Sequence, residues 1–133
     1  MLYTSTLPNG IDIGTVVKIC GSVPCCSDRF EIGLTCSEWR DADYALHLCA
    51  CFQKCQVVFN TREDGVWGVE ECGNGFPFHR GQAFEMMIIT DPEGFKVVVG
   101  DQKYHHFCYR VPVSQVRRLE VNGKVTLESV NIF

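Results

Sequence analysis

A tryptophan beside a glycine, followed by an acidic residue, is the first group of side chains that could recognise a ligand. Trp67-Gly68-Val69-Glu70 begins seven residues after Asn60, the end of the short run Val58-Phe59-Asn60. A small neighbour leaves one face of an indole approachable. The apolar face of a sugar can stack on such a ring while amide and carboxylate groups bind its hydroxyls. Two interpretations stay open: a carbohydrate site, or a core tryptophan beside an incidental surface glutamate.

A second candidate is a run that carries a histidine and several thiols. The even positions from Leu46 to Phe52 are apolar, so the odd positions should share the opposite face of a strand, namely His47, Cys49, Cys51, Gln53 and then Cys55. A zinc site could draw on them, but residues two apart on a strand are about 6.6–6.8 Å apart along its axis, which is wide for one tetrahedral ion. We interpret them as thiols on a half-buried sheet face and predict no metal or cofactor. No acyl-transfer signature surrounds any cysteine, so we predict no enzyme.

The segments that must position these groups are short β-rich runs between turn residues. Ten strands are predicted, at residues 16–20, 30–34, 44–52, 56–60, 66–70, 84–90, 95–99, 104–107, 116–121 and 125–132. Their spacing of about 8–12 residues is typical of an all-β sandwich. Asp64-Gly65 and residues 91–94 mark turns. Asn122-Gly123 is the strongest hairpin pattern, because a type I′ turn needs positive φ at both central residues.

Length and composition bound the remaining possibilities. With 133 residues, 46% of them hydrophobic and 21% charged, the chain is expected to form one globular domain over residues 1–133. A net charge of −4, with no basic cluster longer than Arg117-Arg118, argues against a nucleic-acid partner. The apolar runs are far shorter than the roughly 18 residues of a membrane span. The N-terminus does not read as a secretory signal peptide, so we expect synthesis in the cytosol and nine free cysteines.

Six motifs, in one order along nearly the whole chain, resemble the carbohydrate-recognition domain of the galectin family, including the domains of tandem-repeat galectins. They are the first strand at 14–21, an R-F-x-I-N-L-like strand at 28–34, V-x-N at 58–60, W-G-x-E at 67–70, F-P-F-x-x-G-x-x-F-E at 76–85, and the tail from 95 to 133. The resemblance implies a jelly-roll sandwich of two antiparallel sheets. It also implies β-galactoside binding on the concave sheet, and release from the cytosol to the extracellular space by a route that needs no signal peptide.

The chain departs from the family pattern where the family holds its sugar. We match the motif H-x-N-P-R to residues 51–55, so that Cys51 replaces the histidine, Gln53 the asparagine and Cys55 the first arginine, with a shortened loop before Asn60. Cys72 replaces the final arginine of W-G-x-E-x-R. The surviving sugar contacts are Asn60, Trp67 and Glu70, with Gln53 as a fourth. Arg62 is a candidate new partner for Glu70, although a solvated loop residue is the plainer interpretation.

The lost contacts set an expectation for affinity. A hydrogen bond to a charged group is worth about 1.5–3 kcal/mol, and millimolar binding corresponds to only about 4 kcal/mol in total. We therefore expect a lectin with a degenerate galactoside site and weak or altered specificity, whose partners are glycans or glycoproteins. The alternative is an interaction module on the same scaffold, which has lost lactose binding and contacts a protein or a second copy of the chain.

Overall fold

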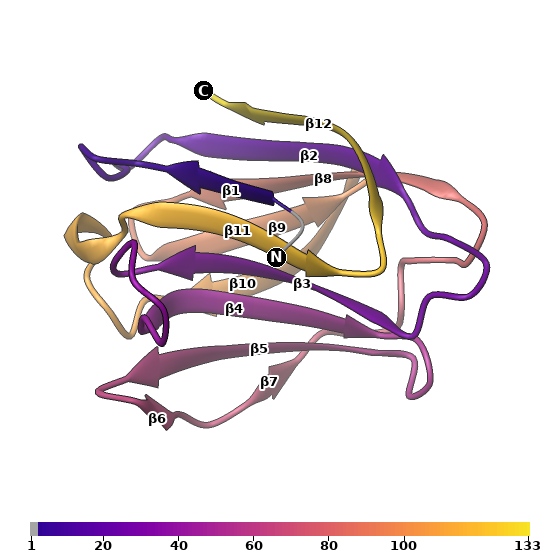
Figure 1. Ribbon diagram of the computed structural model, residues 1–133, viewed down its shortest axis with the longest axis horizontal. Coiled ribbons are helices and arrows are strands. Elements are labelled where there is room, and N and C mark those ends of the chain that lie inside the picture. The colour runs from indigo at the N-terminus through magenta and orange to yellow at the C-terminus, as the bar shows by residue number, and fades with distance from the viewer. Residues whose placement is uncertain (1–2) are drawn as a thin grey trace.

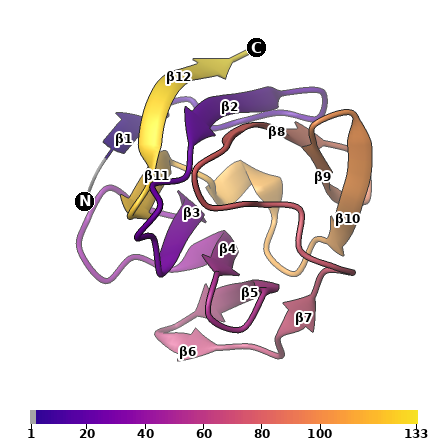
Figure 2. The same cartoon turned by 90° about the vertical axis from the view of Figure 1, so that its right-hand side faces the viewer.

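The computed structural model describes residues 3–133, which form two facing antiparallel β-sheets (Figure 1). The first sheet has the strand order β1-β11-β3-β4-β5-β6, with β7 also paired to β5. Its strands are β1 (Tyr3–Thr6), β11 (Arg118–Gly123), β3 (Arg29–Thr35), β4 (Tyr44–Cys51), β5 (Gln56–Glu63), β6 (Val66–Trp67) and β7 (Glu71–Cys72). In Figure 2 the strands from β11 to β6 follow an arc, so the outer face of this sheet is concave.

The second sheet has the order β10-β9-β8-β2-β12. Its strands are β2 (Val16–Ser22), β8 (Ala83–Thr90), β9 (Gly94–Val99), β10 (Gln102–Cys108) and β12 (Thr126–Ile132), and one 3₁₀ helix covers Val113–Gln115. The predicted all-β sandwich of two antiparallel sheets is thereby confirmed. No helix within residues 3–133 is long and apolar enough to cross a membrane.

The core lies between the two sheets and follows from alternation along the strands. In β2 and β4 the buried residues recur at every second position over most of the strand, as expected for strands with one face in a core. The largest fully buried side chains come from both sheets: Phe30, Phe59, Phe95, Phe107, Ile19, Ile32, Leu34, Leu46, Leu48, Met86, Ile88 and Leu119. Residues of the opposite parity on β3, β4 and β5 therefore point to the concave face.

The predicted hairpin at Asn122-Gly123 is wrong. Strand β11 pairs with β1 and β3, whereas β12 pairs with β2 in the other sheet, so the chain crosses between the sheets here. Only Gly123 has positive φ, at 91°. No hairpin forms, because both strands already have other partners. The Lys124 N–H, which donates to the Arg29 carbonyl at 3.0 Å, holds the crossing.

The tight turn with two positive φ values is instead at Asp64-Gly65, where φ is 52° and 76°. Both backbone N–H groups donate to the carboxylate of Asp43, at 2.8 and 3.0 Å. Of the run predicted at 66–70, only Val66 and Trp67 form a strand, β6. Strand β7 lies beyond that run, and β1 was not predicted. The turn matters for the site, because it returns the chain beside β5 and pairs Arg62 with Trp67.

Candidate functional site

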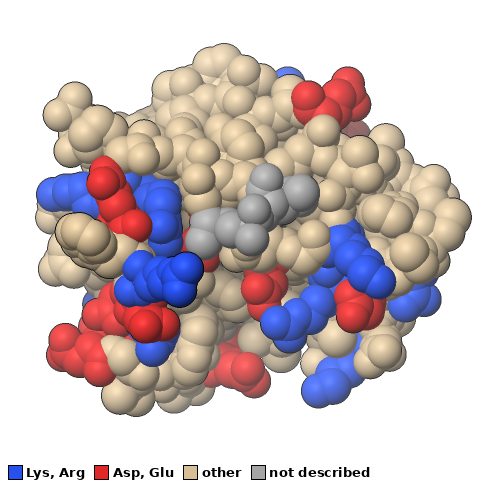
Figure 3. Space-filling view, viewed as in Figure 1, with Lys and Arg blue, Asp and Glu red and all other residues tan. Residues whose placement is uncertain are grey.

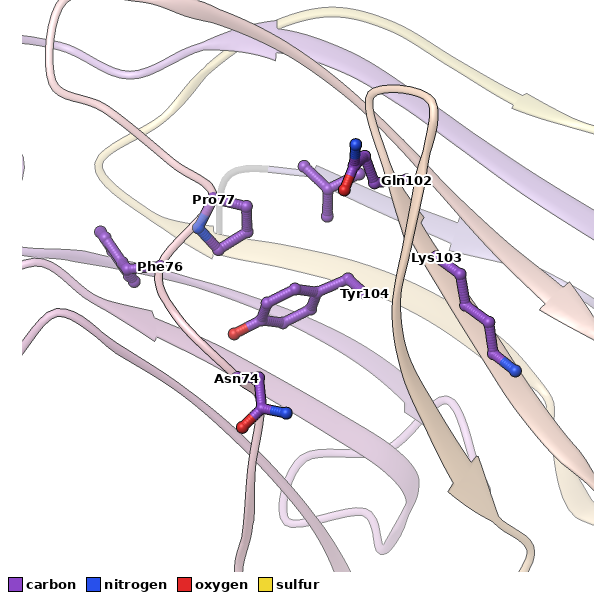
Figure 4. Close-up of a pocket in the computed structure, with 7 residues that line it drawn as sticks. Asn74, Phe76, Pro77, Gln102, Lys103 and Tyr104 are labelled. Carbon is purple, nitrogen blue, oxygen red and sulfur yellow. The ribbon is translucent and has the colours of Figure 1, made fainter.

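A groove of about 560 Å³ lies on the concave face. It is lined by Arg29, Glu31, His47, Cys49, Cys51, Lys54, Gln56, Val58, Asn60, Trp67, Gly68 and Glu70. A smaller hollow of about 400 Å³ lies between residues 74–77 and β10, where Tyr104 points toward the 74–77 segment and Lys103 points away (Figure 4). The two hollows have no lining residue in common, and only the groove gathers the residue types that the sequence singled out.

Strand pairing arranges the groove side chains in cross-strand rows. His47 lies between Gly33 and Asn60, and Cys49 lies between Glu31 and Val58. A further row places Cys51 between Arg29 and Gln56. His47, Cys49 and Cys51 thus face the groove while Leu46, Leu48 and Ala50 are buried, which confirms the alternation expected for these positions.

Trp67 stands at the edge of the groove with 47% of its surface exposed. Its indole is not free on every side. The ring of Tyr44 stacks on it with centroids 5.5 Å apart and planes 19° apart, and the His47 ring lies 5.0 Å away. The Arg62 guanidinium is 6.0 Å from the indole centroid. The indole is therefore accessible to a ligand, but one of its faces is occupied by a side chain of the same chain.

Asn60 is fixed by three groups around its amide. Its Nδ2 donates to the Gly68 carbonyl at 2.9 Å, and its Oδ1 accepts from the Thr61 N–H at 2.8 Å and from Arg110 Nη1 at 3.1 Å. Only 5% of Asn60 is exposed. A Cβ on Gly68 would lie 3.0 Å from Arg110 Nη1 and 3.2 Å from Asn60 Oδ1. Glycine at position 68 thus allows the close approach that holds the amide in one orientation.

Arg110 reaches this site from the segment after β10, and sequence reasoning missed it. Its Nη2 donates to Glu71 Oε2 at 3.0 Å, and Glu71 Oε1 lies 2.9 Å from His105 Nε2. Burial raises the pKa of Glu71. The hydrogen bonds to His105 and Arg110, together with the charges of these two residues, lower the pKa by more than burial raises it, so the pKa is below its usual value. The sequence carries no sign that Arg110 contacts Asn60, because the two residues lie 50 positions apart.

The groove carries no net charge, because Arg29 and Lys54 balance the carboxylates of Glu31 and Glu70. Glu31 pairs with Arg29 at 2.7 Å, and His47 Nε2 lies 3.8 Å from the same carboxylate oxygen. Burial lowers the pKa of His47, so the imidazole is neutral at neutral pH. Burial, followed by the charge of Glu31, raises the pKa of Cys49 to about 11, so this thiol is neutral as well. On the face shown in Figure 3, acidic and basic side chains are interspersed, and a ligand there meets individual groups rather than a field of one sign.

The predicted site residues fall into two groups. Asn60, Trp67, Glu70 and Cys51 line the groove together. Gln53 and Cys55 do not line it; they lie in the turn that follows β4, with Cys55 at a φ of 49°. The physical reason is that β4 ends at Cys51, so the alternation that predicted a common face stops there.

Lys54 and Arg62 are two further charged residues near these side chains. Lys54, in the turn between β4 and β5, lines the groove. Arg62 lies beside Trp67, and no ion pair joins it to Glu70 within residues 3–133. Sequence reasoning assigned no sugar contact to His47, Arg29, Glu31 or Gln56, all of which line the groove.

These positions correct the motif match made from the sequence. The strand before Val58 is β4, so its groove-facing residues supply the first, third and fifth positions of H-x-N-P-R. A match over residues 47–51 therefore fits the groove better than the match over residues 51–55. His47 keeps the histidine, Cys49 replaces the asparagine and Cys51 replaces the arginine. The shortened loop inferred before Asn60 followed from the displaced match.

Comparison with known proteins agrees with the fold. Residues 2–132 match the family model described as galactoside-binding lectin. The chain is 50% identical over 131 residues to galectin-7 of Rattus norvegicus and to galectin-7 of Homo sapiens, covering 98% of this chain and 96% of each relative. A structure of a human galectin-16 variant superposes with a TM-score of 0.91 at 27% identity, covering 98% of this chain and 94% of that one. The chain therefore belongs to the galactoside-binding lectin family, the galectins.

Proposed function

We propose that this galectin binds glycans in the concave groove through a degenerate galactoside site, with weak or altered specificity. The observation that carries the proposal is the exposed indole of Trp67 beside His47 and Asn60. A pyranose can stack its C–H face on the indole, while the imidazole, the Asn60 amide and the Glu70 carboxylate bind its hydroxyls. Gln56 is the amide at the opposite end of the groove, beside Cys51, and takes the role first assigned to Gln53.

The two thiols are the reason to expect weak binding. Cys49 and Cys51 stand where the family motif has an amide and a guanidinium, and a thiol is a weak donor with no fixed charge. Each missing hydrogen bond to a charged group removes about 1.5–3 kcal/mol. Binding in the millimolar range has only about 4 kcal/mol in total. Simple galactosides such as lactose are therefore expected to bind at millimolar strength or weaker.

A protein-interaction module remains the second candidate, and one observation favours it. Val66 and Val69 flank Trp67 and are both strongly exposed, at 68% and 80%. Exposed apolar side chains grouped beside a groove are typical of protein contacts. In this function the same edge would bind a protein surface or a second copy of the chain, and sugars would not compete.

We further infer that residues 1–133 act as one binding domain without catalysis, with glycans and glycoproteins as partners. Galectins are typically cytosolic and are secreted without a signal peptide. We infer the same location and route of release for this protein. Its nine free cysteines suit a reducing compartment.

The test is a glycan array followed by calorimetry with the best glycan and with lactose, on the wild type, Trp67→Ala and Trp39→Ala. Trp39 is a matched control, because it is the other tryptophan, is exposed, and does not line the groove. Binding lost only in Trp67→Ala supports the lectin. Absence of binding to every glycan by the wild type, or equal loss in both variants, contradicts it.

A further inference from the structure

We propose that Tyr44 sets the sugar affinity of this galectin by competing with a pyranose for the indole of Trp67, on which the Tyr44 ring stacks. The proposal rests on the proposed lectin function and adds a residue that governs it. The phenol ring of Tyr44 competes with a galactoside for the Trp67 indole, so a galactoside that stacks on the indole must displace this ring.

A β-bulge brings Tyr44 to the concave face. The pairing of β4 shifts register between Tyr44 and His47, so that Tyr44 is opposite Arg62 while His47 is opposite Asn60. Ala45 and Leu46 are both buried in this bulge. Regular alternation would send Tyr44 toward the core and Ala45 to the groove. The extra residue reverses this and adds an aromatic ring to the row that contains Arg62 and Trp67.

The ring has room only because position 33 is a glycine. A Cβ on Gly33 would lie 2.6 Å from Cε1 and 2.9 Å from Cδ1 of Tyr44. The family strand motif R-F-x-I-N-L has asparagine at this position, whereas this chain has Gly33. The missing side chain at position 33 on β3 thus leaves the space that the Tyr44 ring on β4 fills.

The ring is held at both ends. The Tyr44 hydroxyl donates a hydrogen bond to Glu120, which is only 3% exposed and also accepts from Arg118 Nη2 at 3.2 Å. At the other end the ring stacks on Trp67, and the His47 ring lies 5.0 Å from both aromatic rings. Burial raises the pKa of Tyr44 above its ordinary value of 10, so the hydroxyl stays protonated and can donate at neutral pH.

The consequence is a cost that a sugar must meet before it stacks. A galactoside that uses this face has to break the stacking of two rings and the bond to Glu120. Truncation to alanine removes the occupant, so Tyr44→Ala should bind lactose at least about tenfold more tightly than the wild type. Tyr44→Phe keeps the ring and loses only the bond to Glu120, so its gain should be smaller.

The test uses Trp39→Phe as the background, so that Trp67 is the only tryptophan and its fluorescence reports on one ring. Three proteins are compared: the background with Tyr44 intact, the background with Tyr44→Ala, and the background with Tyr44→Phe. Acrylamide quenching without sugar measures how accessible the Trp67 indole is, and calorimetry measures lactose affinity. Tyr104→Phe, whose ring is outside the groove, is the control for loss of a tyrosine hydroxyl. Far-UV circular dichroism confirms that each variant is folded, and Tyr44→Phe, which removes only one oxygen, keeps the test available if Tyr44→Ala unfolds.

The expected result is stronger quenching in Tyr44→Ala together with tighter lactose binding, while Tyr104→Phe matches the background. Unchanged quenching overturns the proposal, as does weaker sugar binding in Tyr44→Ala, because the ring would then be a sugar contact. Equal lactose binding by background and Tyr44→Ala overturns the role of Tyr44 and leaves the lectin function standing. Stronger quenching, with no lactose bound in calorimetry and no glycan bound on the array by any variant, overturns the lectin function itself, and the role of Tyr44 in affinity with it.

Discussion

Removing the Arg110 side chain is expected to destabilise the protein more than removing an exposed arginine of the groove. Arg110 joins Glu71 to Asn60 through Nη2 and Nη1, and its guanidinium carbon lies 4.7 Å from the Phe107 ring centroid. Arg110→Ala removes all of these contacts from one side chain. It leaves Asn60 Oδ1 with the Thr61 N–H as its remaining donor.

The magnitude follows from the exposure of each contact. The pair with Glu71 counts for no more than about 1 kcal/mol, since both side chains are partly exposed, at 24% and 37%. The bond to the buried Asn60 amide contributes about 0.5–1.5 kcal/mol, and the contact with Phe107 about 0.5–1 kcal/mol. Arg110→Ala should therefore lower the free energy of unfolding by about 1–3.5 kcal/mol.

The assay is urea unfolding followed by tryptophan fluorescence, with Arg29→Ala as the control. Arg29 also forms an ion pair, with Glu31 at 2.7 Å, but its side chain is 58% exposed, so its loss should cost less than about 1 kcal/mol. Arg110→Lys should recover only part of the lost stability, because a single ammonium cannot donate to Asn60 and Glu71 at once as the two guanidinium nitrogens do. Equal losses for Arg110→Ala and Arg29→Ala would refute the reasoning.

Three further predictions concern the pH dependence of stability, the glycine at the crossing between the sheets, and the reactivity of the thiols. Because the folded-state pKa of Glu71 lies below 4.5, its carboxylate stabilises the fold above that pH and the contribution is lost as pH falls through the folded value. The stability gap between the wild type and Glu71→Gln in urea should thus narrow from about pH 6 to pH 3, and a constant gap would contradict it. Gly123→Ala should cost about 1–3 kcal/mol more than Gly100→Ala in thermal unfolding. Both have positive φ, but only at Gly123 would a Cβ meet backbone atoms, at 2.6 and 2.7 Å. Brief alkylation read by mass spectrometry should label the exposed Cys55 and Cys72 well before Cys49, whose pKa is about 11, and equal labelling rates would be inconsistent with this.

The sequence by itself determined the class of fold and much of the groove. Alternation from Leu46 to Cys51 was sufficient to assign His47, Cys49 and Cys51 to one face, because neighbouring side chains on a strand point in opposite directions. The order of the motifs indicated the family, which the comparisons show. Asp64-Gly65 was recognisable as a turn, since these residues tolerate positive φ.

Only the tertiary structure decided where local periodicity breaks. The end of β4 at Cys51 removed Gln53 and Cys55 from the groove, and the bulge after Tyr44 turned an apparent core residue outward. Asn122-Gly123 has the composition of a hairpin, yet each flanking strand pairs with a different sheet. Arg110 reaches Asn60 across 50 positions. Register, bulges and long-range polar contacts depend on how two sheets pack against each other, and a single strand's pattern carries no information about its partner.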